Sequence, residues 1–361
     1  MPDSTLSIVI PTYNERDNIK PLIERLGRAL SGRKYEIVFV DDNSKDGTAE
    51  AASAMSAEYP VRVIVRRDER GLASAVVHGF NQTTGPVIGV MDADLQHPPE
   101  VVADLVKAIE AGADIAIGSR YVKGGGCEGW SLVRRIISKG AVLLCHLLLP
   151  RARGINDPMS GFFMLKRPVV AGADLRPTGY KILLEILIAG QHSKVTEVPF
   201  VFKARERGES KLSSKTQIDS LKHLYSLMKR TGEIMRFVKF AVVGGSGVLV
   251  NLGAYWVLTR FLNMGERQFG ALAISFEASV ISNFLLNNFF TFADRRVSRT
   301  LPFLIQFLKF NGISLGGYGI QAASLWLLSK QLGINDIVAV AIGIVIATLW
   351  NYLLNTLWTW K

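Results

Sequence analysis

The last 125 residues of the chain contain four apolar stretches, at about 237–262, 269–292, 304–330 and 337–359. Each reaches the roughly 20 apolar residues that a helix needs to cross the hydrocarbon core of a bilayer. Residues 237–361 carry only 9 basic and 4 acidic side chains, whereas residues 1–236 carry 33 and 27. We therefore expect two parts: a charged globular domain, residues 1–230, and a transmembrane domain of four helices, residues 237–361.

The loop between the second and third predicted spans is basic, and it contains Arg295, Arg296 and Arg299. The loops 263–268 and 331–336 are not basic. Basic loops stay on the cytoplasmic side of a membrane. Residues 1–7 lack the apolar core of a signal peptide. We therefore expect a multi-pass membrane protein with its globular domain and C-terminus in the cytoplasm.

The transmembrane part also contains an internal repeat. Residues 283–287 (NFLLN) recur as residues 351–355 (NYLLN). An earlier set of residues recurs with a similar offset, namely Phe237, Lys239, Phe240 and Gly247 as Phe307, Lys309, Phe310 and Gly317. Duplication of a helical hairpin predicts this pattern, and chance similarity in a biased composition is the alternative. Residues 244–247 (GGSG) predict close helix packing rather than a dinucleotide loop. Glu277 lies within the second span, where a carboxylate is costly without a partner or a function.

The overall charge and the cysteines exclude several classes of protein. The formal net charge of +11 is compatible with nucleic-acid binding, but the sequence contains no helix-turn-helix, zinc-finger or RNA-binding pattern. Cys127 and Cys145 are too few for a disulfide framework or a metal cluster. The high content of both apolar and charged residues excludes disorder and a collagen-like repeat.

The globular part alternates short β-rich runs with helical stretches. The runs are residues 6–11, 35–40, 61–65, 87–91 and 115–118, and the helical stretches include 19–30, 48–55 and 100–111. This alternation predicts a mostly parallel, doubly wound α/β sheet. Ligands of such sheets bind beyond the carboxyl ends of the strands.

Polar clusters follow three of the predicted strands, namely residues 11–15 (PTYNE), 41–44 (DDNS) and 92–96 (DADLQ). Asp92 and Asp94 are separated by one residue, so both point the same way on an extended chain and can share one divalent cation. Each cluster alone also fits a surface turn or a helix cap. Three clusters at one sheet edge predict a site for a metal ion and a nucleotide diphosphate.

The full set of motifs resembles the inverting, family 2 glycosyltransferases, which have the GT-A fold. The resemblance covers most of residues 5–230, and six segments carry it in order: PTYNE (11–15), VDDNSKDGT (40–48), DADLQHPP (92–99), GSRY (118–121), NDPMSGF (156–162) and RERGESKL (205–212). Within the family, the chain is most similar to the polyprenyl-phosphate sugar synthases, above all those that make dolichol-phosphate mannose. The transmembrane part is similar to the small GtrA-like four-helix domains.

The resemblance implies a role for each matching residue. The donor nucleotide is expected at Pro11, Tyr13, Glu15, Val40, Asp42, Asp92, Ala93, Asp94, Arg205 and Lys211. A cofactor, Mg²⁺ or Mn²⁺, is expected at Asp92, Asp94 and Gln96. The acceptor phosphate is expected at Arg120, Arg134 and Ser138, and the catalytic residues are expected to be Asp94, Arg120 and Arg205.

The chemistry of the acceptor supports these assignments. A phosphate monoester carries about −1.5 to −2 charge at pH 7 and is already a nucleophile, so it needs cations to hold it and no general base. Arginine suits this task because its planar fork binds phosphate oxygens bidentately. Asp157 lies where relatives with hydroxyl acceptors carry a base. We assign it no such role, and a structural acid in a turn is the alternative.

Two segments of the globular part, about 131–149 and 216–236, are amphipathic and predict helices that lie in the membrane interface. The first is almost long enough to be a fifth span, and both could instead pack on the sheet of a soluble domain. Contact of these two helices with lipid would bring the predicted site at the sheet edge to the lipid phosphate.

The predicted function is transfer of mannose from GDP-mannose to dolichyl (polyprenyl) phosphate, with inversion. A UDP-glucose enzyme acting on the same kind of lipid is the nearest alternative. A processive polysaccharide synthase would add a QxxRW motif and more spans, and the sequence contains neither. A non-catalytic, lipid-translocating protein would not need the DADLQ, PTYNE and GESK segments together.

Overall fold

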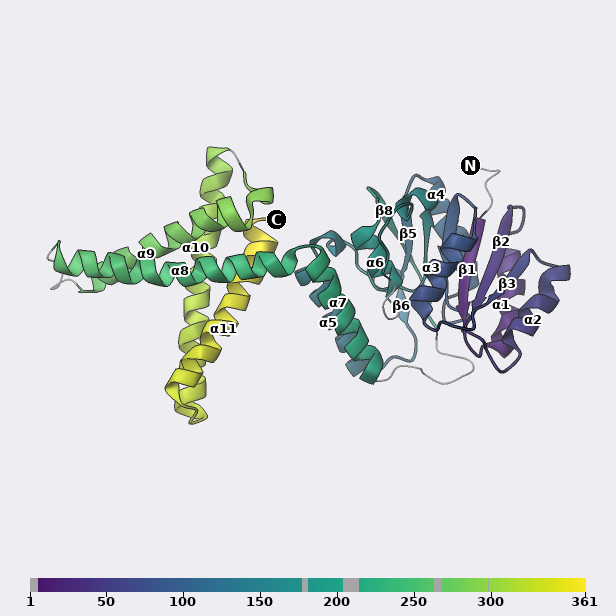
Figure 1. The fold of residues 1–361 in the computed structure, drawn as a ribbon, viewed down its shortest axis with the longest axis horizontal. Coiled ribbons are helices and arrows are strands. Elements are labelled where there is room, and N and C mark those ends of the chain that lie inside the picture. Colours follow the sequence, from purple (N-terminus) through teal and green to yellow (C-terminus); the bar gives the residue numbers. More distant parts are fainter. Residues whose placement is uncertain (1–5, 177–180, 204–213, 263–267, 298) are drawn as a thin grey trace. The chain divides into compact units, whose positions relative to one another are not determined.

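The computed structural model describes residues 6–176, 181–203, 214–262, 268–297 and 299–361 (Figure 1). The chain divides into two compact units, Met1–Thr231 and Gly232–Lys361. The predicted donor residues Arg205 and Lys211 lie outside the described residues.

The first unit is built on a seven-stranded sheet with the strand order β3-β2-β1-β4-β7-β5-β8. β7 is antiparallel to β4 and β5, and the other pairs are parallel. The predicted mostly parallel α/β fold is therefore confirmed, although sequence analysis did not identify β7 and β8. The strands are β1 (Leu6–Thr12), β2 (Tyr35–Asp41), β3 (Val61–Val65), β4 (Val87–Val90), β5 (Ile115–Ser119), β7 (Phe163–Lys166) and β8 (Val195–Pro199). A small second sheet pairs β6 (Gly126–Cys127) with β9 (Val201–Phe202).

Helices cover both faces of the large sheet because its strands are apolar on both sides. In β1, Ile8 and Ile10 belong to the apolar core on one face, and Val9 belongs to the core on the other. The first face is covered by α1 (Arg16–Ala29), α2 (Thr48–Ala54) and α4 (Val102–Glu110). The second face is covered by α3 (Leu72–Gln82) and α6 (Ile182–Ala189). This double cover is what near-continuous apolar strands require.

Two further helices of this unit, α5 (Leu132–Leu148) and α7 (Ser214–Arg230), contribute to a smaller apolar cluster with α6. Glu185 of α6 is fully buried and accepts hydrogen bonds from His223, at 2.8 Å, and from Arg230, both on α7. A buried carboxylate needs such partners. The alternative of α5 as a fifth span is not supported, because α5 is not among the described helices long and apolar enough to cross a membrane.

The second unit contains four long helices within the described residues, α8 (Glu233–Arg260), α9 (Gln268–Leu286), α10 (Thr300–Leu325) and α11 (Asp336–Leu354). Three segments are long and apolar enough to cross a membrane: Glu233–Arg260, Phe269–Thr291 and Asp336–Thr359. They correspond to three of the four predicted spans. The fourth, at 304–330, falls on α10 and is not confirmed as a span; this helix carries the polar residues Gln306, Lys309 and Asn311.

Equivalent contacts recur in the two hairpins of this unit. Asn283 of α9 packs directly against Gly247 of α8, and Asn351 of α11 packs in the same way against Gly317 of α10. Both hairpins end in a π-helical segment, Asn287–Thr291 and Asn355–Thr359. A lysine lies over an aromatic ring in each hairpin, with Lys239 Nζ 4.6 Å from the centre of the Phe290 ring and Lys309 Nζ 5.5 Å from that of Trp358.

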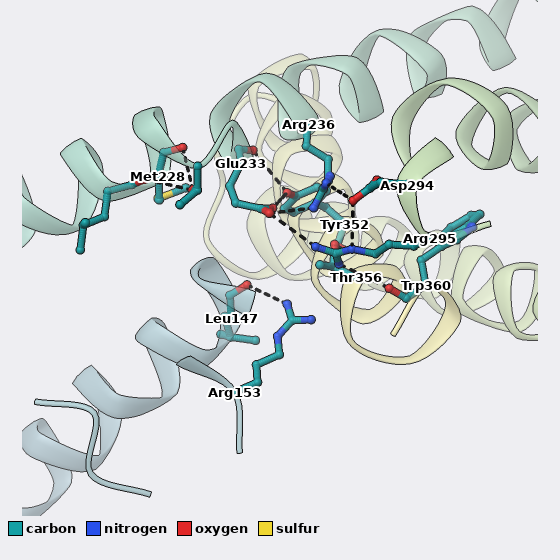
Figure 2. A network of polar contacts seen from close by, with 12 residues as sticks. Leu147, Arg153, Met228, Glu233, Arg236, Asp294, Arg295, Tyr352, Thr356 and Trp360 are labelled. Carbon is teal, nitrogen blue, oxygen red and sulfur yellow. Dashed lines mark hydrogen bonds and ion pairs between the residues drawn. The ribbon is translucent and has the colours of Figure 1, made fainter. Parts of the chain in front are cut away.

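The two hairpins meet in an aromatic stack and a polar network. Phe292 and Trp360, which directly follow the two π-helical segments, stack with ring centres 4.5 Å apart and an interplanar angle of 7°. Beside them, Glu233 pairs with Arg236 at 2.7 Å and with Arg295 at 3.5 Å, and it accepts a hydrogen bond from the Tyr352 hydroxyl at 3.3 Å (Figure 2). The network therefore joins both hairpins. It uses residues of α8 and α11 and of the loop after α9.

Glu277, the carboxylate predicted to need a partner, has one. Its Oε1 accepts a hydrogen bond of 2.7 Å from the Asn311 side chain of α10. Glu277 thus links α9 to α10, which belong to different hairpins.

The Gly247–Asn283 contact provides a test of the hairpin packing. A Cβ added at Gly247 would lie 2.8 Å from Asn283 Cγ, so the whole amide group would have to move. We expect Gly247→Ala to cost about 1–3 kcal/mol through overpacking. Gly244→Ala is the matched control, because its Cβ meets nothing within 4 Å. Thermal unfolding of the full chain in detergent measures both, and equal melting temperatures would contradict the packing.

Candidate functional site

The ends of β1 and β2 form one rim of the candidate site. Their parallel register pairs Pro11 with Val40, and the Asp42 amide donates to the Thr12 carbonyl at 3.0 Å. The Glu15 amide donates to the Thr48 hydroxyl at 2.9 Å. The structure therefore brings the predicted nucleotide residues of both segments together at the carboxyl edge of the sheet.

Asp42 is almost fully buried, and its carboxylate has fixed partners. Its Oδ1 accepts a hydrogen bond of 2.8 Å from Arg66 Nε, and its Oδ2 accepts one of 2.8 Å from the Gly71 amide. Arg66 is itself only 6% exposed. Charge-assisted bonds of this kind hold a carboxylate in one orientation. Asp42 is thus presented rigidly at the end of β2.

Tyr13 is covered by a second arginine of the same segment. The guanidinium of Arg70 lies 5.1 Å from the centre of the Tyr13 ring, at the distance of a cation–π contact. Sequence analysis missed both Arg66 and Arg70. They follow β3, so a search for polar residues after every predicted strand could have found them.

Asp92, Ala93 and Asp94 follow β4, the other neighbour of β1. The Asp92 amide donates to His97 Nδ1 at 3.2 Å, and the Gln96 amide donates to Asp94 Oδ1 at 3.2 Å. These bonds fold the segment into a tight turn. Burial lowers the pKa of His97 to about 4, so its ring is neutral at pH 7 and can accept the amide hydrogen.

Three aromatic rings enclose His97 on the far side of this turn. It stacks on Phe162 with ring centres 5.1 Å apart, and it meets the edges of Phe200 and Phe202, each at 5.5 Å. The apolar packing explains why the imidazole is not charged. His97 therefore anchors the Asp92–Asp94 turn, a role that sequence analysis did not assign.

The residues predicted to hold a divalent cation fit such an ion. Asp92 and Asp94 provide carboxylates, and the Gln96 amide nitrogen donates to the Lys203 carbonyl at 2.9 Å, so its oxygen is left for another partner. A side chain at Gly161 would crowd the site, because a Cβ there would lie 3.2 Å from Asp92 Oδ2. The part of the chain that the structure describes contains no cluster of three or more His, Cys, Asp or Glu residues suited to a metal. An ion that is held by only two carboxylates keeps coordination positions for substrate phosphates.

A buried ion pair lies beside this turn. Arg120, at the end of β5, donates from Nε and Nη2 to the two oxygens of Asp157, each at 2.7 Å. The Arg120 amide donates to the same carboxylate at 3.1 Å. Asp157 is fully buried and the Arg120 side chain is 10% exposed. Burial opposes the charge of Arg120, but the hydrogen bonds and charge of Asp157 raise its pKa above the ordinary value.

The other predicted acceptor residues, Arg134 and Ser138, lie on α5. Ser138 accepts a hydrogen bond of 2.7 Å from the Tyr121 hydroxyl. The Arg134 guanidinium lies 4.2 Å from the centre of the Trp130 ring, and that of Arg120 lies 5.4 Å from the same ring. The structure therefore joins the predicted acceptor residues through two aromatic side chains, Tyr121 and Trp130.

The Asp92–Asp94 turn and the predicted acceptor residue Arg120 are close enough to interact electrostatically. The charges of Asp94, Arg120 and Asp157 all affect the pKa of His97. Lys181, which directly precedes α6, belongs to the same region: its pKa is lowered to about 8, mainly by burial, and the charge of Arg120 lowers this pKa as well while that of Asp157 raises it. No sequence signal singled out Lys181. It follows no predicted strand and belongs to no motif.

Two family models match the chain, in the same order as its two units. Residues 7–171 match the model described as "Glycosyl transferase family 2", and residues 239–360 match the model described as "GtrA/DPMS, transmembrane domain". The second match and the apolar helices identify a membrane protein.

Two curated relatives and one solved structure are similar over most of their length. The dolichol-phosphate mannosyltransferase of Pyrococcus furiosus is 49% identical over 98% of this chain and 99% of the relative. That of Saccharomyces cerevisiae is 40% identical over 65% of this chain and 92% of the relative. A crystal structure of glucosyl-3-phosphoglycerate synthase from Mycobacterium tuberculosis, in complex with Mn²⁺ and UDP-glucose, superposes with a TM-score of 0.51, at 22% identity over 63% of this chain and 79% of that one. This last likeness supports the fold alone.

The Arg120–Asp157 pair predicts a large stability effect. We expect Asp157→Ala to cost about 3–5 kcal/mol, because it leaves the charge of Arg120 buried without its partner. Asp104→Ala removes a carboxylate from an exposed pair with Lys107 and should cost about 0–1 kcal/mol. Thermal unfolding of the two variants in detergent provides the comparison. Similar losses in both would show that the buried pair is absent in solution.

Proposed function

We propose that this chain, which belongs to the dolichol-phosphate mannosyltransferase family, transfers mannose from GDP-mannose to dolichyl (polyprenyl) phosphate with inversion at the anomeric carbon. The names of the curated relatives support mannose as the transferred sugar and dolichyl phosphate as the acceptor, and GDP as the donor nucleotide rests on the resemblance of the motifs. The observation that carries the proposal is the pairing of a cationic acceptor cluster, Arg120 and Arg134, with the aspartate turn after β4. The cationic cluster suits a phosphate nucleophile, and the aspartate turn suits a leaving diphosphate.

The donor nucleotide is proposed to bind along the ends of β1 and β2, against Pro11, Tyr13, Glu15, Val40 and Asp42. The rigid carboxylate of Asp42 suits hydrogen bonds to a base or ribose. The diphosphate would lie toward Asp92, Ala93 and Asp94. Arg205 and Lys211 are proposed to contact it as well, on the resemblance alone, because they fall outside the described residues.

Mg²⁺ or Mn²⁺ is the proposed cofactor, held by Asp92, Asp94 and the amide oxygen of Gln96. When bound, it supplies positive charge next to the diphosphate. His97 and the hydrogen bonds within the turn hold the two carboxylates in place before the donor arrives.

The environment of Asp157 supports a phosphate acceptor. A hydroxyl acceptor would need a base to take its proton, but both oxygens of Asp157 are bound to Arg120. An acceptor phosphate oxygen, already anionic, forms the new bond to the anomeric carbon as the bond to the donor diphosphate breaks. No proton has to be removed. Arg120, Arg134 and Ser138 would hold the phosphate during this step.

The apolar surface of α5 supports contact with the membrane. Leu132, Val133, Ile136 and Ile137 are 59–73% exposed, while only Val142 and Cys145 of this helix are buried. On α7, Leu221 and Tyr225 are also exposed. Exposed apolar faces of this size mark interaction surfaces. Both helices are proposed to lie in the bilayer interface, and the basic residues Arg295, Arg296 and Arg299 support a cytoplasmic position for the catalytic unit and the C-terminus.

The proposed reaction is tested by mannose transfer. The purified chain, with Mg²⁺ or Mn²⁺, should move labelled mannose from GDP-mannose to a polyprenyl phosphate, and EDTA should abolish transfer until metal is restored. Asp94→Asn should lower kcat by at least about 100-fold, as expected when charge stabilisation of the leaving group is lost. Asp68→Asn, an exposed carboxylate of the same unit, should leave activity unchanged.

Other outcomes of this assay would contradict particular parts of the proposal. Transfer from UDP-glucose alone would make the donor assignment wrong. Full activity in EDTA would show that the reaction needs no divalent cation. If the chain transfers sugar from neither donor and Asp94→Asn changes nothing, the enzyme assignment is wrong and the lipid-translocating alternative is left.

The membrane contact of α5 is tested separately. The double variant Ile136→Glu/Ile137→Glu places two charges on the exposed face, and we expect at least a tenfold higher KM for a long polyprenyl phosphate in vesicles, with an unchanged KM for the donor. The matched control Ser53→Glu/Ala54→Glu places the same charges on an exposed part of α2. If the two variants behave alike, α5 does not contact lipid.

A further inference from the structure

Trp130 is the residue between the two acceptor arginines. It precedes Ser131, the N-cap residue of α5, and its ring centre lies 5.4 Å from the guanidinium carbon of Arg120 and 4.2 Å from that of Arg134. The edge of Phe202 packs against it, with ring centres 5.7 Å apart. Indole is the aromatic side chain that attracts cations most strongly. The ring of Trp130 therefore contacts two guanidinium groups of like charge.

The indole nitrogen of Trp130 is a donor without an acceptor. Its Nε1 is buried and has no hydrogen-bond partner in the described part of the chain. Buried polar groups are nearly always paired in native proteins, so each exception requires an explanation. Tryptophan nitrogen can only donate. The missing partner is therefore an acceptor atom.

The charges around Trp130 indicate what that acceptor is. Asp157 balances the charge of Arg120 and occupies its Nε and Nη2, so the pair is close to neutral. A phosphate monoester of about −1.5 to −2 charge fits a donor that lies beside the guanidinium groups of both Arg120 and Arg134. Because Arg120 already donates to Asp157, a neutral donor such as the indole N–H helps to complete the hydrogen bonds of the phosphate. The Tyr121 hydroxyl is already used, because it donates to Ser138.

We propose that Trp130 is an acceptor-phosphate-binding residue, whose indole N–H donates a hydrogen bond to a phosphate oxygen while its ring keeps Arg134 beside Arg120. The inference rests on the proposed function, because it takes the phosphate monoester of a polyprenyl lipid as the group that enters the cluster. It adds a neutral donor to a site otherwise described by its arginines. The binding step is non-covalent and leaves the protonation of the indole unchanged.

The test separates the ring of Trp130 from its N–H group. Trp130→Phe keeps an aromatic face for both arginines and removes the donor, whereas Trp130→Leu removes both. We expect Trp130→Phe to lower kcat/KM for polyprenyl phosphate by about 10- to 100-fold, the loss typical of one hydrogen bond to a charged group. Trp130→Leu should lose more. The KM for GDP-mannose should not change in either variant, and a purely structural role would not produce this split.

Three controls accompany these variants. Trp256→Phe makes the same substitution at an exposed tryptophan of α8 and should leave both KM values unchanged. Trp130→His, measured at pH 8, restores an aromatic N–H and should recover part of the loss; it also tests the donor if Trp130→Phe does not fold. Inorganic phosphate as a competitor of the wild-type protein, compared with Trp130→Phe, distinguishes recognition of phosphate itself from recognition of the lipid.

The inference is overturned if Trp130→Phe matches the wild-type protein, or if it raises both KM values equally. Failure of the unchanged protein to transfer mannose to any polyprenyl phosphate would overturn the proposed function, and the inference with it. The two failures are distinct, since the first occurs in a protein that still makes the product.

Discussion

The pairing of β1 with two parallel neighbours is the constraint on which the catalytic unit depends. β2 and β4 lie on either side of β1 and run in its direction, so three chain segments end at one edge of the sheet. The bond from the Asp42 amide to the Thr12 carbonyl continues this pairing into the loops. The nucleotide residues and the aspartate turn are near each other only because these strands share a direction. If β4 were reversed, the aspartate turn would lie at the opposite edge of the sheet, about one strand length away.

The second organising interaction is the Arg120–Asp157 pair, which connects the end of β5 to the loop before β7. It occupies both oxygens of Asp157, the carboxylate at the position where relatives with hydroxyl acceptors carry a base, and this favours the proposed phosphate acceptor. The same pair explains why a cationic site can be buried at all, since an unpaired guanidinium in this position would be costly. In the proposed reaction, Asp157 holds Arg120 in place and takes no proton.

The sequence was sufficient to predict five of the seven strands of the sheet, the three polar clusters and their meeting point. Short apolar runs identify β1, β2 and β4, and the carboxyl ends of parallel strands share an edge wherever they occur. It was not sufficient for Arg66, His97, Trp130 and Lys181. Their roles depend on burial or on partners such as Asp42 for Arg66, 24 residues away, and Arg120 for Trp130, which no local pattern records. The antiparallel β7, Phe163–Lys166, was missed as well, although it is as long as β4.

The stack of Phe292 on Trp360 joins two hairpins that are alike in backbone and different in charge. Where the first hairpin has Glu233 and Arg236, the second has Phe303 and Gln306, whose contacts are an aromatic edge on Phe284 at 5.1 Å and a bond of 3.1 Å to the Thr359 carbonyl. If the two hairpins were exchanged in the sequence, the aromatic stack would remain. The ion pairs would then no longer lie next to the segment that follows the catalytic unit in the sequence. The two halves are alike in shape and unequal in polarity, so the domain has a fixed order although its architecture is nearly symmetric.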